Sequence, residues 1–257
     1  MPTTDVDATE KAAPASSVEY SAGVVRLGNI KPAAPEVEEA TPDITGKGGE
    51  DLEKKSFADF GVTDPIVDAL EDKGITHPFP IQALTLGPAL ERHDIIGQAK
   101  TGTGKTLGFG IPVLEDVIAP DEEGYEDLLN PNKPQALIIL PTRELTKQVA
   151  QDLREAAKYL STRIVEIYGG VAFEPQIEAL ERGADIVVGT PGRLIDLLRK
   201  GHLHLSGVET VVLDEADEML DLGFLPDVET LLSRVPENRH TMLFSATMPG
   251  PVVALAR

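Results

Sequence analysis

Short apolar runs alternate with longer segments of helical periodicity between residues 56 and 257. Six of these runs are predicted strands: Asp94–Gln98, Ala136–Leu140, Arg163–Tyr168, Asp185–Gly189, Thr210–Asp214 and Thr241–Ser245. Most are continuous stretches of Val, Ile and Leu rather than alternating apolar and polar positions. This pattern is typical of strands that are buried on both faces of a parallel sheet.

Amphipathic helical segments separate the predicted strands. The segment Arg143–Leu160 places its apolar residues on one stripe, namely Leu145, Val149, Leu153, Ala156, Ala157 and Leu160. Glu174–Arg182 and Arg193–Lys200 show the same periodicity. This alternation predicts an α/β fold with a mostly parallel sheet, right-handed crossovers and helices on both faces. Pro120–Pro134 fits neither pattern, so we expect an exposed loop there.

Residues 1–55 differ in composition from the rest of the chain. They are rich in Ala, Pro, Glu, Thr and Gly and contain few large apolar residues. Such a segment cannot bury enough apolar surface to offset the entropy lost on ordering. We therefore expect a disordered acidic tail over residues 1–55, and one folded domain over residues 56–257.

Composition excludes several classes of site. The chain has no cysteine, which rules out disulfides and thiolate zinc sites within it and fits a reducing compartment, so we expect a cytoplasmic protein. No apolar run approaches the roughly 18 residues that a membrane span needs, and the first residues lack the pattern of a secretory signal. We therefore expect no membrane partner.

The formal net charge of −20 bears on any nucleic-acid ligand. Residues 1–55 hold eleven acidic and six basic residues, so a net charge of −15 belongs to the remainder. Nucleic-acid binders usually show a basic surface. A polyanion would therefore have to be held by local Arg, Lys and backbone N–H groups, against the field of the whole protein.

A phosphate-binding loop is predicted at Ala99–Thr106, AKTGTGKT, between the strand Asp94–Gln98 and a helical segment. It fits G-x-x-x-x-G-K-[ST] with Ala in place of the first Gly. Gly102 and Gly104 let successive N–H groups face an anion, Lys105 reaches the outer phosphates, and the Thr106 hydroxyl completes a Mg²⁺ shell. The nucleotide-binding residues are then Ala99, Lys100, Thr101, Gly102, Thr103, Gly104, Lys105 and Thr106. The alternative is a glycine-rich turn that binds nothing, which a Lys-Thr pair at a helix start disfavours.

Two adjacent carboxylates end the predicted strand Thr210–Asp214. Burying Asp214 and Glu215 is costly unless a cation offsets them. Ligands of such folds lie at the carboxyl ends of the strands, so we expect this cation to be the Mg²⁺ of a bound nucleotide. Asp214 would hold it through water, and Glu215 would deprotonate the attacking water. The alternative is an acidic helix cap, to which Asp217 also contributes.

Together with further motifs, these residues resemble the DEAD-box RNA helicases, and the resemblance covers residues 56–257. DEAD stands at Asp214–Asp217 and SAT at Ser245–Thr247. PTREL, Gly-Gly and TPGR follow in the family's order, at residues 141–145, 169–170 and 190–193. The resemblance implies a RecA-like domain that binds ATP with Mg²⁺ and contacts RNA, within an RNA-stimulated ATPase that unwinds RNA. It also implies that Ser245 and Thr247 hydrogen-bond the Asp214–Asp217 segment; the alternative is a plain polar turn.

Residues 56–82 resemble the family's Q motif. The resemblance implies that the Gln82 amide reads adenine, since it offers both a donor and an acceptor, and that Phe57 stacks on the base. Packing of Phe57 in the core is the alternative. The chain departs from the family pattern at Ile75, where an aromatic residue is common, and at Phe79, where Thr or Ser is common.

The resemblance also implies an RNA-binding surface that contacts phosphates and ribose rather than base edges, so that binding is largely independent of sequence. Its residues would be Pro141, Thr142, Arg143, Gly170, Thr190, Gly192 and Arg193. These residue types also suit helix N-termini. Both interpretations can hold, because a helix N-terminus is itself a phosphate site.

Members of this family have two RecA-like domains, and nothing in the chain resembles the HRxGR element of the second. We therefore expect the ATP-binding half of a helicase, with catalytic residues Lys105, Asp214, Glu215, Ser245 and Thr247, that hydrolyses ATP poorly by itself. An ATP-gated RNA clamp or RNA chaperone and a DNA-acting ATPase remain alternatives. The acidic tail is a candidate to bind a protein partner.

Overall fold

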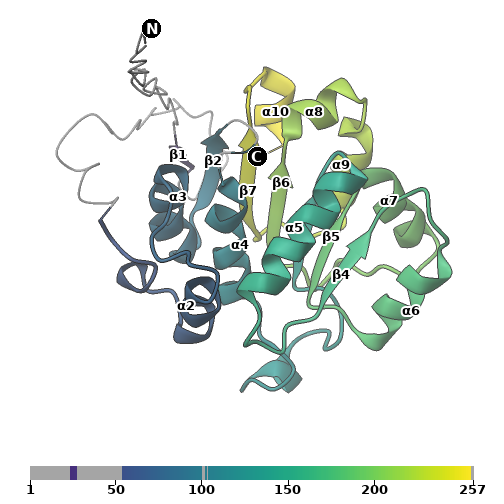
Figure 1. Cartoon of the computed structure of the whole chain (residues 1–257). Coiled ribbons are helices and arrows are strands. Elements are labelled where there is room, and N and C mark those ends of the chain that lie inside the picture. Colours follow the sequence, from purple (N-terminus) through teal and green to yellow (C-terminus); the bar gives the residue numbers. More distant parts are fainter. Residues whose placement is uncertain (1–23, 28–53, 100–101, 103, 256–257) are drawn as a thin grey trace, which may run out of the picture.

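A seven-stranded sheet forms the centre of the molecule, with the strand order β1-β2-β7-β6-β3-β5-β4 (Figure 1). The computed structural model describes residues 54–99, 102 and 104–255, together with the backbone of residues 24–27. The strands are β1 (Val24–Leu27), β2 (Asp94–Gln98), β3 (Ala136–Ile139), β4 (Ile164–Ile167), β5 (Ile186–Gly189), β6 (Thr210–Asp214) and β7 (His240–Ser245). Every neighbouring pair is parallel except β1 and β2. The predicted α/β fold with a mostly parallel sheet is confirmed.

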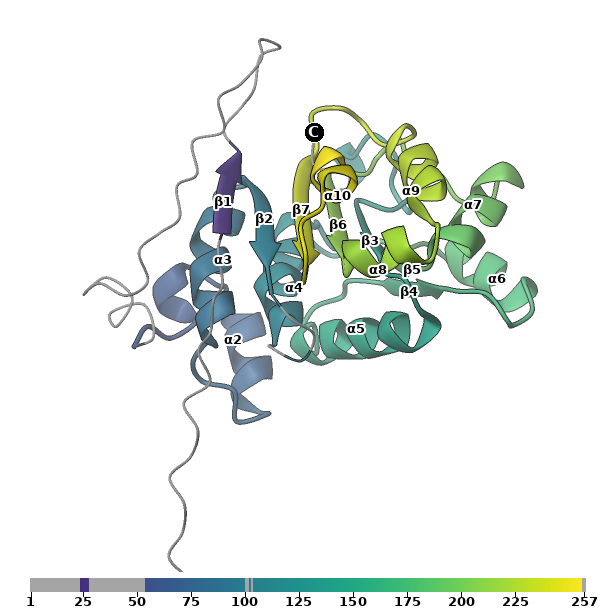
Figure 2. The same ribbon diagram turned by 90° about the horizontal axis from the view of Figure 1, so that it is seen from above.

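Helices cover both faces of the sheet (Figure 2). One face carries α2 (Asp64–Glu71), α3 (Pro80–Leu90), α4 (Lys105–Asp116) and α5 (Arg143–Ala156). The other carries α6 (Glu174–Arg182), α7 (Pro191–Arg199), α8 (Ala216–Asp221), α9 (Leu225–Leu232) and α10 (Gly250–Ala254). Within β3 the buried side chains alternate between the two cores, Ile138 in one and Leu137 and Ile139 in the other. The period of two that every strand imposes therefore builds one core on each face.

The predicted strands agree with the observed ones to within one residue at each end, and β2 and β6 have the predicted bounds. Helix α5 buries Val149, Leu153 and Ala156 of the predicted stripe. The apolar pattern did not predict α2, α3, α8, α9 or α10. Helix α3 has apolar residues around most of its circumference, and α8 and α10 span only six and five residues, too few to show a helical period.

Strand β1 corrects one expectation. Residues 1–55 were expected to form a disordered tail, but Val24–Leu27 pairs antiparallel with β2, in a register from Val24 opposite Gly97 to Leu27 opposite Asp94. Without this strand, β2 would present an unpaired edge, which proteins tend to cover. Residues 1–23 and 28–53 lie outside the described part of the chain, so the expectation is untested for them.

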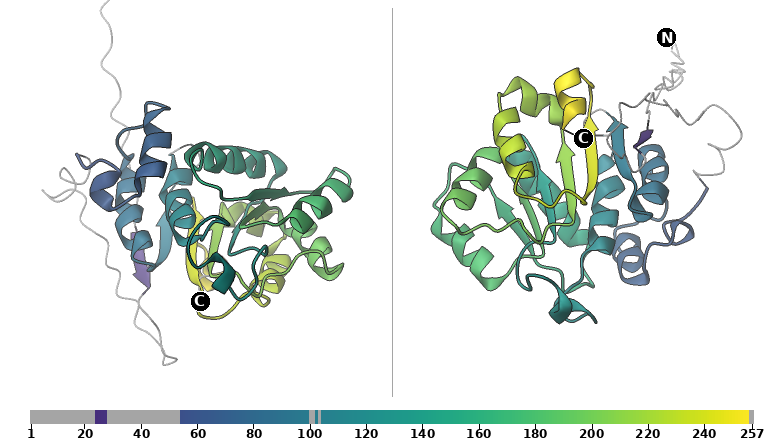
Figure 3. Two further views of the ribbon diagram at one scale, coloured as in Figure 1. Left: turned by 90° about the horizontal axis from the view of Figure 1, so that it is seen from below. Right: turned by 180° about the vertical axis from the view of Figure 1, so that it is seen from behind.

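The segment Pro120–Pro134 is only partly the exposed loop that the pattern predicted (Figure 3, right, at the bottom). It contains a short 3₁₀ helix, Tyr125–Asp127, whose tyrosine is buried. The Tyr125 hydroxyl accepts hydrogen bonds from the Arg163 guanidinium and from the Asn132 N–H. Leu129, by contrast, is 82% exposed. The segment is therefore held in place at Tyr125 and exposed to solvent at Leu129.

In the part of the chain that the structure describes, none of the helices combines the length and the apolar character that a membrane crossing requires.

Gly97 of β2 lies opposite Phe244 of β7, where there is no room for a larger side chain. A Cβ atom at this position would lie 2.6 Å from two ring carbons of Phe244, which is fully buried and packs against Phe109. We expect Gly97→Ala to lower the free energy of unfolding by about 1–3 kcal/mol, because neighbouring groups must shift to relieve the overlap. Urea unfolding followed by circular dichroism measures this change.

Gly169 supplies the matched control. It lies in the segment after β4, its φ angle is not positive, and a Cβ atom there would meet nothing within 4 Å. Gly169→Ala should leave the free energy of unfolding unchanged or raise it by up to about 1 kcal/mol, because alanine at such a position mainly restricts the unfolded chain. Equal changes in the two variants would show that contact with Phe244 does not set the effect.

Candidate functional site

The carboxyl ends of the six parallel strands meet at one edge of the sheet, and the motifs of the sequence lie in the segments that follow them. The phosphate-binding loop follows β2, the Asp214–Asp217 segment closes β6, and Ser245–Thr247 closes β7. Because β2, β7 and β6 are neighbours in the sheet, these three segments lie side by side. The sheet order therefore brings together residues that are more than 100 positions apart in sequence.

Glycines shape the described part of the phosphate-binding loop. Gly102 and Gly104 have φ angles of 82° and 75°, which only glycine adopts at little cost. Helix α4 begins at Lys105, directly after Gly104, so its first N–H groups are available to an anion at this edge. The loop is tied to β7 by the Ala99 N–H, which donates to the Ser245 carbonyl at 3.0 Å. Lys100, Thr101 and Thr103 lie outside the described residues.

Lys105 forms a buried ion pair with both carboxylates. Its Nζ lies 2.8 Å from Asp214 Oδ1 and 3.5 Å from Glu215 Oε1, and the three residues are only 5%, 2% and 6% exposed. Lys105 therefore offsets the charge of both carboxylates in the described structure. That the Mg²⁺ of a bound nucleotide offsets them stays a prediction. The lysine at the start of α4 and the acidic pair thus form one electrostatic unit.

Burial dominates the chemistry of Asp214. Removal from water raises the pKa of this carboxyl to about 6, although the neighbouring Lys105 ammonium favours the charged form. Asp214 Oδ1 also accepts a hydrogen bond from the Glu215 N–H at 2.9 Å. The carboxylate therefore stays ionised at neutral pH, but a modest fall in pH protonates it.

Glu215 occupies a strained turn between β6 and α8. Its φ and ψ angles of 55° and 47° lie in the left-handed region, which costs a residue other than glycine about 1–3 kcal/mol. The turn ends the strand and starts a helix within a single residue, and it places the Glu215 side chain beside Lys105. Such strain is common where a side chain must be held in one position.

Asp217 connects the acidic segment to the end of β7, as the resemblance implied. Its N–H donates to Ser245 Oγ at 3.0 Å, and its carboxylate accepts from the N–H and the hydroxyl of Thr247, both at 2.9 Å. Partial burial raises the pKa of Asp217, but hydrogen bonds with Ser245 and Thr247 outweigh it and hold the pKa below its ordinary value. The predicted hydrogen bonds between the two segments are therefore present.

Gln82 joins α3 to the phosphate-binding loop. Its side chain is 1% exposed, its Nε2 donates to the Gly104 carbonyl at 2.6 Å, and its Oε1 accepts from the Phe79 N–H at 2.9 Å. These bonds use one of its two donors and one of its two acceptor positions. The predicted contact between Gln82 and adenine stays a prediction.

Phe57 does not reach the site. It is 1% exposed and packs in the core with Ile66, Leu70 and Leu86, and it does not line the cavity described below. A ring buried on all sides offers no face to a base. The structure therefore supports the alternative of core packing and corrects the prediction that Phe57 stacks on adenine.

A cavity of about 430 Å³ joins these features, a volume typical of small-molecule sites. It extends from Asp214 and Glu215, past the start of α4, to residues of α2, α3 and α5. Its lining includes Lys73, Ile75, Phe79, Gln82, Gly104, Lys105, Thr106, Gln148 and Asp152. Phe79 was not predicted as a site residue; its signal in the sequence is a large apolar residue between two prolines at a helix start.

The expected RNA-binding residues lie at the same edge of the sheet, beyond β6. Pro141 and Thr142 follow β3, and Thr142 Oγ1 accepts from the Leu145 N–H at 3.3 Å as the cap of α5. Gly170, with a φ angle of 78°, follows β4. Thr190 and Gly192 stand at the start of α7, after β5. The tertiary structure therefore brings these residues to one edge.

Basic side chains on α5 flank an aromatic ring at this edge. The Arg143 guanidinium lies 5.6 Å from the Tyr168 ring centroid, and Lys147 Nζ lies 5.3 Å from it. Arg143 was predicted to contact RNA, but Lys147 was not. The two are four positions apart on an exposed helix face, and this spacing could have identified Lys147.

Arg193 is held inside the chain rather than presented to a ligand. It is 8% exposed, donates to the Val171 carbonyl at 2.8 Å and the Ala172 carbonyl at 3.5 Å, and lies 4.0 Å above the Phe173 ring. It was predicted to contact RNA directly. The structure instead gives it a positioning role for the segment after Gly170.

The oxygen ligands at the site suit a magnesium ion that arrives with a nucleotide. Within the described residues, no group of three or more His, Asp or Glu side chains is placed to hold a metal ion. Mg²⁺ usually keeps several waters and binds one or two protein oxygens together with phosphates. Thr106 at the start of α4 and Asp214 at the end of β6 match that requirement.

Comparisons with known proteins agree with this geometry. A family model described as DEAD/DEAH box helicase matches residues 79–255. "DEAD-box ATP-dependent RNA helicase 3B, chloroplastic" from Zea mays is 50% identical over 210 residues, which cover 82% of this chain and 28% of that protein. "DEAD-box ATP-dependent RNA helicase CshA" from Geobacillus kaustophilus is 45% identical over 201 residues, which cover 78% and 41%.

A solved structure gives the same picture. The crystal structure of a DEAD box protein from the hyperthermophile Methanococcus jannaschii aligns with a TM-score of 0.71 at 40% sequence identity, covering 78% of this chain and 52% of that one. The chain thus spans well under two thirds of the length of each of these proteins.

Lys105 should contribute to the stability of the fold as well as to ligand binding. Lys105→Ala would leave Asp214 and Glu215 buried without their cation. Breaking a buried ion pair by removing one partner typically costs about 3–5 kcal/mol, and we expect a loss of this size in the free energy of unfolding at neutral pH. Urea unfolding without nucleotide measures it. Lys147→Ala, which removes an exposed lysine, is the control, and equal stability of the two variants would contradict the structural role.

The burial of Asp214 predicts a specific pH dependence. Its pKa is about 6 in the folded chain and about 4 in an unfolded one, so folding takes up a proton between these pH values. The stability of the wild type relative to Asp214→Asn should therefore fall as pH rises from 4 to 6, by up to about 3 kcal/mol, and stay level above pH 6. Urea unfolding in EDTA at several pH values tests this. A relative stability that rises over this range would show that Asp214 is not desolvated.

Proposed function

The chain belongs to the DEAD/DEAH box helicase family, and we propose that it is the ATP-binding half of an ATP-dependent RNA helicase. The observation that supports this most strongly is the buried contact of Lys105 with Asp214 and Glu215 at the start of α4. Lys105 follows the glycine loop after β2 and pairs with the acids at the end of β6, which lies two strands away in the sheet. This arrangement matches what nucleoside triphosphate hydrolysis requires. A binding module without chemistry would not need all three together.

ATP would bind with its phosphates at the N-terminus of α4, where the Lys105 ammonium can turn from the carboxylates to the outer phosphates. Thr106 and Asp214 would then hold Mg²⁺, which neutralises charge that develops on the transferred phosphoryl group. Glu215 would orient the attacking water and accept its proton. Its strained backbone and its place beside Lys105 keep its carboxylate at the phosphate end of the cavity.

Hydrogen bonds connect the acidic segment of this site to the end of β7. Asp217 is bonded to Ser245 and Thr247, which ties the start of α8 to the end of β7. We propose that this link transmits the state of the nucleotide to the RNA-binding edge. The hydrogen bonds that the resemblance implied for Ser245 and Thr247 support this proposal.

RNA would lie along the carboxyl ends of β3, β5 and β4. Thr142, Arg143, Gly170, Thr190 and Gly192 can offer backbone N–H groups, hydroxyls and one guanidinium there, and these suit phosphates and ribose. A chain with a net charge of −20 can bind a polyanion only through such local contacts. The affinity for RNA should therefore be modest and should fall steeply as the salt concentration rises.

Unwinding is proposed for the whole helicase rather than for these residues. The chain spans between 28% and 41% of the length of the two curated relatives described above. A second RecA-like domain would complete both the ATP site and the RNA channel. Such a domain would supply an arginine to the ATP site, and the absence of this arginine typically lowers the rate of phosphoryl transfer by a factor of about 10³–10⁵. The chain by itself should bind ATP and ADP but hydrolyse ATP slowly.

Glu215→Gln tests the proposal. An amide keeps the shape of the side chain but cannot accept the proton of water, so we expect hydrolysis to fall by about 10²–10⁴ with little change in ATP affinity. The measurement is phosphate release with and without single-stranded RNA, together with equilibrium binding of a fluorescent ATP analogue. Hydrolysis is measured on the protein as its cells make it, and binding is measured on the 257-residue chain.

The outcomes separate the alternatives. RNA-stimulated hydrolysis that Glu215→Gln removes supports the helicase proposal. ATP-dependent RNA binding with negligible hydrolysis in the wild type indicates an RNA clamp, and stimulation by DNA equal to that by RNA indicates a DNA-acting ATPase. Absence of any ATP binding by the wild-type chain would overturn the proposed function.

A further inference from the structure

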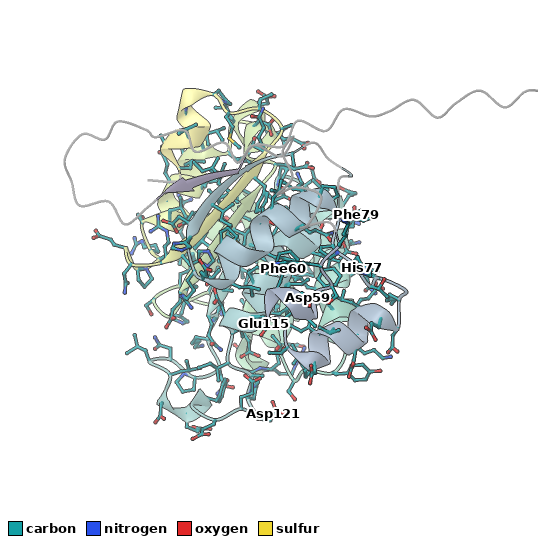
Figure 4. All side chains as sticks on the ribbon, turned by 90° about the vertical axis from the view of Figure 1, so that its left-hand side faces the viewer. Asp59, Phe60, His77, Phe79, Glu115 and Asp121 are labelled. Atoms are coloured by element: carbon teal, nitrogen blue, oxygen red, sulfur yellow. The ribbon has the colours of Figure 1, made fainter. Side chains whose placement is uncertain are left out.

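Phe79 is an exposed aromatic residue that lines the cavity beside the phosphate-binding loop. It precedes α3 and lies at the outer edge in Figure 4. Its side chain is 61% exposed, which is unusual for a phenylalanine. Four other large apolar side chains of the described residues are exposed, namely Leu129, Tyr159, Val171 and Leu222, but none of these lines the cavity that contains Lys105. Phe79 therefore presents apolar surface to the site itself.

The surrounding contacts fix the position of Phe79. Its N–H donates to Gln82 Oε1, and Gln82 Nε2 donates to the Gly104 carbonyl. Its ring covers Gly104, because a Cβ atom on that glycine would lie 2.7 Å from Phe79 Cδ2. A buried glutamine thus ties the segment that carries the ring to the residue before α4. The ring rests on the phosphate-binding loop, takes part in the lining of the cavity and keeps most of its surface exposed.

An open ring at this position suits the planar part of a nucleotide. Lys105 and Asp214 mark where phosphates would bind, and Phe79 and Ile75 line the same cavity. Bases stack on aromatic faces, and each such contact typically contributes a factor of about 5–100 in affinity. Phe57, the aromatic residue first expected to stack, is enclosed in the core, and Ile75 has no ring.

We propose that Phe79 is the residue that stacks on the nucleobase of the bound nucleotide. This inference rests on the proposed function and identifies how the same site holds the base. Gln82 then has two effects: it lines the base end of the cavity, and it holds the aromatic residue against the loop that binds the phosphates.

Binding measurements with and without a base test the proposal. The ligands are ADP and inorganic tripolyphosphate, and the variants of the 257-residue chain are Phe79→Ala and Phe79→Tyr. We expect Phe79→Ala to weaken ADP by roughly 5- to 100-fold and to leave tripolyphosphate unchanged. Phe79→Tyr, which keeps the ring, should bind ADP within about two-fold of the wild type. Leu129→Ala, which removes a still more exposed apolar side chain outside the cavity, should change neither affinity.

A second measurement does not depend on loss of binding. The chain contains no tryptophan, so Phe79→Trp introduces a single fluorescent reporter. Stacking of adenine should quench this fluorescence when ADP is added, whereas tripolyphosphate should not. A wild-type chain that binds ADP, with unchanged ADP affinity in Phe79→Ala and no quenching in Phe79→Trp, would overturn the stacking role. A wild-type chain that binds neither ADP nor tripolyphosphate would instead overturn the proposed function.

Discussion

The buried ion pair of Lys105 with Asp214 and Glu215 is the interaction on which the rest of the site depends. Each of the two carboxylates would be costly to bury alone, and the lysine would be costly without them. Their contact therefore fixes the start of α4 against the end of β6, across the intervening strand β7. In the proposed function, the phosphates of ATP would displace the carboxylates from the lysine, because they carry charge of the same sign. The contact would then hold the site together before ligand binding and supply the group that binds the ligand.

Hydrogen bonds extend this unit in two directions. On one side, Asp217 joins Ser245 and Thr247, which lie at the end of β7. On the other, Gln82 joins the Gly104 carbonyl to the segment that carries Phe79. The phosphate-binding loop, the segment that carries Phe79 and the Ser245–Thr247 segment are therefore each tied to this unit by side-chain hydrogen bonds. In the proposed function, a change at the phosphates would reach both neighbours through these bonds.

The charge of the molecule restricts the proposed RNA binding to short-range contacts at one edge of the sheet. The net charge of −20 repels a phosphate backbone at long range. At the carboxyl edge of the sheet, helix N-termini and the pair of Arg143 and Lys147 beside Tyr168 provide short-range attraction. Arg193 contributes indirectly, since its guanidinium holds the carbonyls of Val171 and Ala172. Long-range repulsion combined with short-range attraction favours direct contacts to a nucleic-acid backbone at this edge over long-range attraction by the whole protein.

The sequence by itself determined the parallel strands, the phosphate-binding loop, the acidic pair and the family, because continuous apolar runs and short motifs act locally. It could not determine that Lys105 pairs with Asp214 and Glu215, whether Phe57 or Phe79 has an open ring, or that Arg193 points inward. It also missed the strand Val24–Leu27, whose pairing with β2 joins segments about 70 residues apart. These features depend on the order of strands in the sheet and on which side chains fill the space between layers. Only the tertiary structure decides them, because burial and ion pairing are properties of neighbours in space, not in sequence.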